Sequence, residues 1–189
     1  MPPKTKAYYD RQKAKDKKKK QKEMATISAE HEAAGDPGLK RAMELSAVDA
    51  ELSTLGLVMS DVAADGNCLF SAIMQQLKLA EVAGQPSADE LRALAGQYML
   101  DNAADFSAFV DDDGGLEAHV RTLVASSETW GGDLEIQALA RALKVRVRVV
   151  KALAPFPQFG SEGPELTIVH LEHFMVLGAH YTGTKPKPR

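Results

Sequence analysis

The stretch DGNCLFSAI, residues 65–73, carries the single cysteine of the chain, Cys68, at the point where a turn runs into an apolar segment. Glycine and asparagine tolerate tight-turn geometry, and the apolar residues that continue to Leu79 predict a buried helix. Cys68 therefore stands at the expected N-terminus of that helix, where the dipole favours a thiolate over a thiol. The position indicates a nucleophile, although a lone cysteine in an apolar helix is also a common small core residue.

A histidine far downstream supplies the partner that a catalytic thiol needs. His180 follows the apolar segment 174–178, which we expect to be a strand. A cysteine paired with a distant histidine is the arrangement of nucleophilic thiol catalysis, in which the histidine acts first as base and then as acid. Spacing alone leaves two alternatives open, namely that His180 is an ordinary histidine and that Asp65 is an ordinary turn residue.

Hydrophobic periodicity and capping signals outline the rest of the fold. Ser87 and Glu90 are spaced as a capping box, which places a helix start there. Most helical patterns precede the strand patterns, and this order predicts an α+β domain with a small sheet, not a repeated βαβ unit. The remaining expected helices cover residues 39–52, 116–125 and 133–143, and the expected strands cover 57–59, 145–150, 166–171 and 174–177.

Length and composition predict one soluble domain with an appendage. The chain has 189 residues, of which 44% are hydrophobic and 26% charged, and its formal net charge is −3. A lysine-rich run over residues 4–22 contains almost nothing to bury. We therefore expect a disordered or loosely helical basic arm over residues 1–38, a folded domain over 39–183 and a flexible tail over 184–189.

The cysteine count and the apolar runs limit where the protein works. One cysteine excludes an intrachain disulfide, and no segment reaches the roughly 18 to 20 apolar residues of a membrane span. No secretory signal is recognisable, so we expect a monomer in the cytosol, or also in the nucleus, without membrane contact. His170, His173 and His180 match no usual ligand spacing, and we expect neither a metal nor a cofactor.

Three segments, taken together and in order, resemble the OTU (ovarian tumour) family of deubiquitinating cysteine proteases, whose α+β fold is papain-like. The resemblance covers about residues 39–183, and the basic arm followed by a helix is similar to the OTU-domain-containing 6 subgroup. The matching segments are the DGNC turn with its Leu-Phe-x-Ala-Ile continuation, the block Trp130-Gly131-Gly132-x-x-Glu135-Ile136-x-Ala138-Leu139, and Gly178-x-His180-Tyr181.

The resemblance assigns roles to individual residues. It makes Cys68 the nucleophile, His180 the general acid and base, and Asp65 the active-site aspartate of the motif. The backbone amides of Gly66, Asn67 and Cys68 would form the oxyanion hole. The implied reaction is hydrolysis of an isopeptide or peptide bond after the C-terminal Gly-Gly of ubiquitin, through a thioester on Cys68. The implied partner is ubiquitin or polyubiquitin.

Two further positions carry expectations of their own. Family members commonly have Asn or Asp two residues after the catalytic histidine, and this chain has Thr182 there. A hydroxyl orients the ring more weakly than a carboxylate, so we predict slower turnover. Trp130, Gly131 and Gly132 are interpreted as a wall of the channel for the ubiquitin tail, because glycines admit a close backbone. The alternative is a buried tryptophan beside a helix start.

Other functions remain open on the sequence. The arm at residues 4–22 is either a solvated tail or a contact for RNA, ribosomes or an acidic partner. Residues 39–46 loosely resemble a ubiquitin-interacting helix, but the same residues would serve to dock a helix on the domain. The alternatives to an active deubiquitinase are therefore a ubiquitin-binding module with weak or no catalysis, and an adaptor that works through its basic arm.

Overall fold

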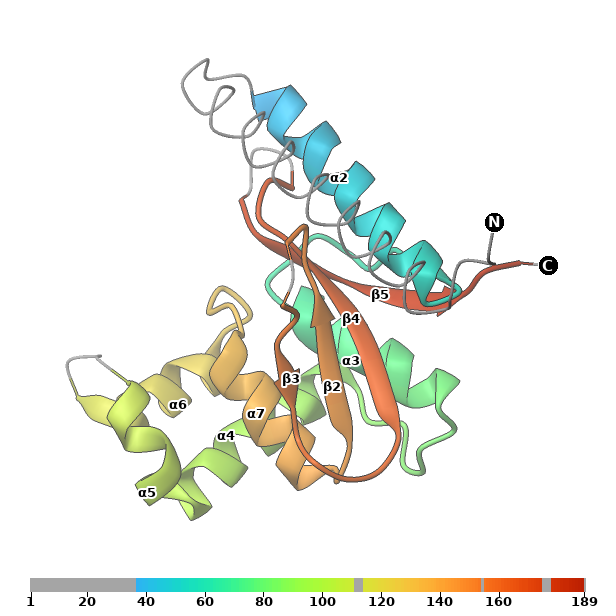
Figure 1. Cartoon of the computed structure of the whole chain (residues 1–189). Helices are drawn as coiled ribbons and strands as arrows, with labels where there is room; N and C mark the ends of the chain where they lie inside the picture. Colours follow the sequence, from blue (N-terminus) through green and yellow to red (C-terminus); the bar gives the residue numbers. More distant parts are fainter. Residues whose placement is uncertain (1–36, 111–113, 154, 175–177, 189) are drawn as a thin grey trace, which may run out of the picture. The chain divides into compact units, whose positions relative to one another are not determined.

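The computed structural model describes residues 37–110, 114–153, 155–174 and 178–188 (Figure 1). The chain divides into two units, residues 1–43 and 44–189. Of the first unit only the start of helix α2 (Pro37–Thr54) is described, and Pro37 occupies the first helical position, where its missing N–H costs no hydrogen bond. The predicted basic arm and its lysine run lie outside the described residues, apart from Pro37 and Gly38, which belong to α2 instead.

The second unit contains a five-stranded mixed sheet with the order β1-β5-β4-β2-β3. Strand β5 lies between β1 and β4 and runs antiparallel to both, whereas β4 and β2 are parallel. β3 is a short antiparallel addition to β2. The strands are β1 (Leu57–Ser60), β2 (Arg146–Val150), β3 (Gln158–Phe159), β4 (Glu165–Leu171) and β5 (His180–Pro186).

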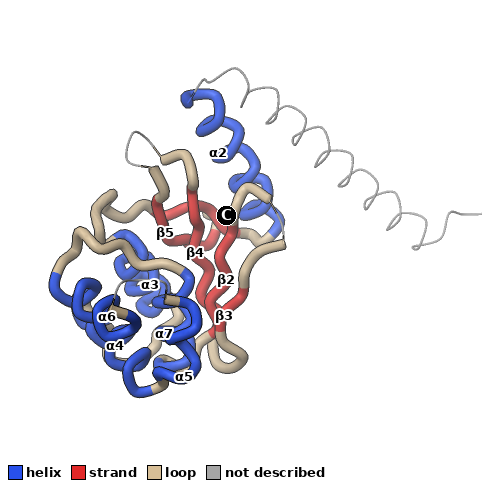
Figure 2. The backbone as a smooth tube through the Cα atoms, turned by 90° about the vertical axis from the view of Figure 1, so that its left-hand side faces the viewer, coloured by secondary structure: helices blue, strands red, loops and turns tan. Residues whose placement is uncertain are grey.

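The main core lies between one face of this sheet and the helices. Figure 2 shows these helices gathered on one side of the strands. Alternate residues of β2 and β4, such as Val149 and Ile168, pack there with Phe70 and Ile73, all of them fully buried. The helices are α3 (Cys68–Leu79), α4 (Ala88–Asp101), α5 (Ala103–Phe106), the 3₁₀ turn η1 (Ser107–Phe109), α6 (Gly115–Ala125) and α7 (Asp133–Ala142).

A smaller core covers the opposite face of the sheet. Val48 and Leu52, both fully buried on α2, pack against Val150, Val169 and Leu171. Alternation along the strands sends these residues to the face away from α3. Of the two alternatives for this helix, docking on the domain is the one that the packing of Val48 and Leu52 supports.

The structure confirms the α+β class and most predicted elements, including the capping box, in which the Glu90 amide donates to Ser87 Oγ at 3.2 Å. Of the expected strand 174–177 only Phe174 is described, and this residue is not in a strand; the rest of that prediction lies outside the described residues. His180 begins β5. The expected flexible tail is wrong for residues 184–186, because they pair with β1 and Thr184 is only 1% exposed.

Within the residues that the structure describes, no helix combines the length and the apolar content that a bilayer span requires.

Candidate active site

The turn that leads into α3 is held by its own backbone and by a neighbouring loop. The Asn67 amide donates to the Asp65 carboxylate at 2.9 Å, and the Cys68 amide donates to the Asp65 carbonyl at 3.1 Å. A Cβ atom on Gly66 would lie 1.4 Å from the carbonyl oxygen of Ser127. No side chain fits at residue 66, so glycine is required there by close approach to the 126–129 loop and not by its φ angle.

Arg92 on α4 fixes the same turn through its guanidinium group. Its Nη2 donates to the Gly66 carbonyl and to Asn67 Oδ1, both at 2.7 Å, and its Nε donates to Asn67 Oδ1 at 3.2 Å. The side chain is only 3% exposed, and its guanidinium carbon lies 4.5 Å from the centre of the Phe70 ring. A planar fork with several donors suits this set of acceptors better than an ammonium would.

The other end of the same guanidinium reaches the last turn of α6 and the loop that follows it. Arg92 Nη1 donates to the carbonyl oxygens of Leu123, Thr129 and Ser126, at 2.9, 2.7 and 3.4 Å. Arg92 therefore connects the cysteine turn with the loop that excludes a side chain at Gly66. Sequence reasoning missed this residue, because a single arginine in a helix gives no local sign that its partners are backbone carbonyls more than 20 residues away.

Cys68 is the first residue of α3 and is 6% exposed. Burial raises the pKa of its thiol, and hydrogen bonds from the backbone amides of Tyr181, Leu69 and Cys68 itself lower it, with burial the larger effect. Burial of the sulfur therefore works against the predicted preference for a thiolate. The helix terminus acts in the expected direction, but desolvation outweighs it.

His180 is the first residue of β5 and directly precedes Tyr181, whose backbone amide donates to the Cys68 thiol. Its ring is stacked on Phe174, with centroids 4.2 Å apart and planes inclined by 22°, and the residue is 4% exposed. Burial lowers the pKa of His180, while the charges of Asp61 and Asp65 act to raise it. No hydrogen bond joins the thiol and the ring among the described residues, and burial favours the neutral form of both groups.

A carboxylate on α2 holds the loop that precedes His180. Glu44, 7% exposed, accepts hydrogen bonds from the backbone amides of Glu172 and His173, at 2.5 and 2.9 Å. Phe174 comes next, and its amide donates to the Gly178 carbonyl at 3.0 Å. Glu44 thus fixes the backbone from which Phe174 reaches the His180 ring. Sequence reasoning missed this role of Glu44, because the carboxylate and the two amides that donate to it are almost 130 residues apart.

Two of the predicted roles meet competing contacts. The Thr182 hydroxyl donates to the Ser60 carbonyl at 3.0 Å, so its proton is engaged on β1 and only its lone pairs remain for an imidazole N–H. The Asn67 and Cys68 amides donate within their own turn and must leave those acceptors to bind an oxyanion. Orientation by Thr182 and the oxyanion hole at Gly66, Asn67 and Cys68 therefore remain predictions.

The Trp130-Gly131-Gly132 block lies beside the first turn of α3. A Cβ atom on Gly131 would come within 2.7 Å of Leu69 Cδ2 and about 3.0 Å of the Phe70 ring, so close packing accounts for this glycine. Trp130 is 48% exposed, which makes the buried-tryptophan alternative wrong. The block is next to the thiol, and its role as a channel wall remains a prediction.

A buried carboxylate anchors this block to α7. The Gly132 amide donates to Glu135 Oε2 at 2.6 Å, and His119 Nε2 lies 2.8 Å from Glu135 Oε1. Glu135 is 2% exposed, so both of its oxygens need partners and both have one.

The three histidines considered as metal ligands point to different neighbours. The His170 ring lies 4.6 Å from the Tyr181 ring, His173 Nδ1 lies 3.7 Å from a Glu44 oxygen, and His180 stacks on Phe174. Among the described parts of the chain, no group of three potential ligands could hold a metal ion.

Comparison with known proteins assigns this site to a family. Residues 63–181 match the family described as OTU-like cysteine protease. The ubiquitin thioesterase otu2 of Schizosaccharomyces pombe is 35% identical over 69% of this chain and 46% of its own length. The mouse OTU domain-containing protein 6A is 29% identical over 98% of this chain and 63% of its own length. The chain thus spans about half to two thirds of the length of these relatives.

Solved structures support the same fold. The OTU domain of OTUD1 superposes with a TM-score of 0.63 at 19% identity, over 79% of this chain and 99% of that domain. An OTU domain solved in complex with ubiquitin gives a TM-score of 0.54 at 23% identity, over 68% of this chain and 69% of that one. The predicted OTU fold is confirmed. With its cysteine turn, its histidine strand and a family match over most of the folded unit, the chain belongs to the OTU-like cysteine proteases.

Proposed function

We propose that this chain is a deubiquitinase that hydrolyses the isopeptide or peptide bond after the C-terminal Gly-Gly of ubiquitin. The observation that carries the proposal is the single thiol at the start of α3. This thiol accepts a hydrogen bond from the backbone amide of Tyr181, the residue that follows His180. Two further facts support it. Relatives of this chain are named ubiquitin thioesterase and deubiquitinase, and one structural neighbour was solved with ubiquitin.

In the first half of the proposed reaction, the thiol attacks the carbonyl carbon of the last glycine. His180 takes the proton from the Cys68 thiol as the sulfur–carbon bond forms, which suits two groups that are both neutral at rest. Backbone amides of the 65–68 turn stabilise the oxyanion. The carbon–nitrogen bond then breaks, the leaving lysine amine receives the proton from His180, and a thioester remains.

In the second half, water attacks the thioester carbonyl. His180 takes a proton from the water and returns one to the departing sulfur, so ubiquitin leaves with a free carboxylate and Cys68 is regenerated. Atoms and protons balance without any further reactant. The burial of Cys68 and His180 implies that the substrate tail displaces or reorders part of the turn before attack.

Ubiquitin with a C-terminal electrophile tests the nucleophile and the substrate class together. We expect one covalent adduct by mass spectrometry, mapped by peptide analysis to Cys68, and no adduct with Cys68→Ala. The His180→Gln variant should form the adduct far more slowly, because the thiol keeps its proton.

Hydrolysis of a ubiquitin–aminomethylcoumarin conjugate completes the test, with Cys68→Ala as the inactive control. Absence of both adduct and hydrolysis, with a folded protein by circular dichroism, would overturn the proposal.

A second candidate function is ubiquitin binding with weak or no catalysis. It is favoured by one observation, the raised pKa of a thiol that is almost fully covered. It predicts that ubiquitin binds, as seen by chemical-shift changes, while the electrophile labels Cys68 no faster than a ubiquitin-free alkylating reagent does.

A further inference from the structure

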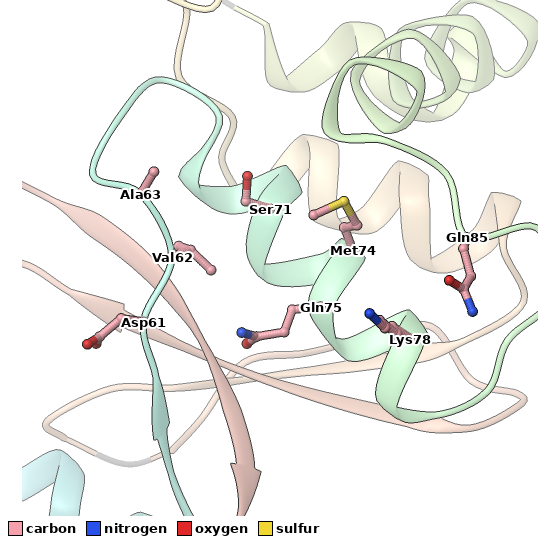
Figure 3. Close-up of a pocket in the computed structure, with 8 residues that line it drawn as sticks. All are labelled: Asp61, Val62, Ala63, Ser71, Met74, Gln75, Lys78 and Gln85. Atoms are coloured by element: carbon pink, nitrogen blue, oxygen red, sulfur yellow. The ribbon is translucent and has the colours of Figure 1, made fainter.

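A cavity of about 510 Å³ lies between the segment that follows β1 and α3, and its lining includes Ser71, one helical turn from Cys68. Figure 3 shows Gln75 and Lys78 pointing from α3 toward the segment that carries Asp61 and Val62. Met74 also lines the cavity and is 37% exposed, so its apolar side chain is accessible to a ligand there.

The cavity and the Trp130-Gly131-Gly132 block flank the thiol on different sides of α3. Leu69 contacts the Gly131 position, whereas Ser71 and Lys78 line the cavity. At about 100° per residue, the Leu69 side chain points about 180° away from that of Lys78 around the helix axis. Cys68, at the end of this helix, therefore lies between the proposed channel for the ubiquitin tail and the cavity.

This placement puts the cavity on the side of the leaving amine. When the ubiquitin tail enters along Gly131, the lysine on the other side of the scissile bond and its flanking residues must leave the thiol in the opposite direction. Asp61 links this direction to the general acid, because it lines the cavity and its charge acts on His180. His180 must deliver its proton to that leaving amine.

We propose that this cavity binds the polypeptide segment that carries the acceptor lysine, on the leaving side of the scissile bond. This inference rests on the proposed function. The lining defines the chemistry of the segment. Met74 and Val62 offer an apolar surface, the Lys78 ammonium offers a partner for a carboxylate, and the Asp61 carboxylate offers one for the amine of the modified lysine itself. The segment recognised is therefore one with an apolar and an acidic residue next to the modified lysine.

Two substrates that differ only on the leaving side test this assignment in the Met74→Glu variant. One is ubiquitin–aminomethylcoumarin, which has no polypeptide there, and the other is ubiquitin joined through an isopeptide bond to the lysine of a fluorescent peptide with Leu and Glu neighbours. We expect kcat/KM to fall about tenfold for the peptide conjugate, the equivalent of about 1.4 kcal/mol, and to stay unchanged for the coumarin conjugate.

Charge reversal provides a second and independent arm. Lys78→Glu should slow the conjugate with an acidic peptide and speed the conjugate in which Lys replaces Glu, while leaving the coumarin conjugate unchanged. The matched control is Leu79→Glu, a substitution on the same helix at a residue that is 51% exposed and does not line the cavity. It should leave both substrates unchanged.

Each remaining outcome is decisive. An equal loss of kcat/KM on both substrates in Met74→Glu, or no loss on either, would overturn the assignment of the cavity. Hydrolysis of the conjugates by the parent protein would still uphold the proposed function. Failure of the parent to cleave either conjugate would instead overturn the proposed function, and this inference with it.

Discussion

The two halves of the active site are held in different ways. The cysteine turn is fixed by three hydrogen bonds from the buried Arg92, whose other three reach Leu123, Ser126 and Thr129, and by a loop that leaves no room for a side chain at Gly66. The histidine half depends on a stacked ring, Phe174, whose loop is held by one carboxylate from α2. The supports of the first half come from α4 and α6, whereas Glu44 lies outside the residues 63–181 that match the family.

The difference teaches where each kind of perturbation acts. Cys68 is held by contacts within the core of the domain, so disturbing them should cost stability and activity together. The ring that stacks on His180 belongs to a loop held by a helix that the family match does not include, so disturbing this support should change activity and the pKa of His180 more than stability. The following variants separate these two expectations.

The largest effect is expected for Arg92→Met. It leaves the carbonyls of Gly66, Leu123 and Thr129 without a donor, which should lower the free energy of unfolding by about 3 kcal/mol and reduce kcat by about a hundredfold. Urea denaturation and coumarin-conjugate kinetics measure the two quantities.

The control for this variant is Arg141→Met, which removes an exposed ion pair with Asp105 and should change stability by less than about 1 kcal/mol. Equal stability losses in the two variants would contradict the special role of Arg92.

Glu44→Gln should act mainly on the histidine half. The Glu172 and His173 amides use one carboxylate oxygen each, and glutamine keeps only one acceptor oxygen, so one amide loses its partner and we expect kcat to fall about fivefold with a stability loss of about 1 kcal/mol. Alkylation of Cys68 by a small reagent should keep its parent rate.

Asp49→Asn on the exposed side of the same helix is the matched control. A proportional loss of Cys68 alkylation in Glu44→Gln would mean that the two halves are not held separately.

Phe174→Leu should shift the pH dependence more than the maximal rate. Burial lowers the pKa of His180 from 6.5, and the imidazole must be neutral to act as base, so the acidic limb of kcat/KM lies below that value in the parent. Loss of the stacked ring admits water, raises the pKa of His180 and moves the limb toward higher pH. A limb that stays in place or moves to lower pH would contradict this account.

The smallest effect is expected for Thr182→Asn. Asparagine carries both a donor for the Ser60 carbonyl and an acceptor for the imidazole N–H, whereas the Thr182 proton is already engaged on that carbonyl. We expect kcat to rise about twofold through better ring orientation, measured with the coumarin conjugate. Unchanged kinetics would count against an orienting role for this position.

The elements predicted from sequence are those whose patterns are local. α3 begins at Cys68 and ends at Leu79 because an apolar helical run follows a turn, and the Ser87 cap fixes the start of α4. β5 could not be predicted, because its sequence HYTGTKP shows neither alternation nor many apolar residues. It is a strand because it pairs on both edges, with β1 and with β4, and such pairing is not visible in a local window.

The site divides in the same way. Cys68 and His180 were identifiable because their residue types and order carry the chemistry. Arg92 and Glu44 were not, since each is a charged residue within a helix whose partners are distant backbone groups. The preference for a thiol over a thiolate was also beyond the sequence, because it follows from how completely the folded chain covers the sulfur.

The cover over Cys68 has a consequence for oxidative damage. Peroxide attacks thiolates that it can reach, and this sulfur is both protonated and 6% exposed at rest. The protein at rest should therefore resist conversion to a sulfenic acid, and sensitivity to peroxide should rise only when the sulfur is uncovered.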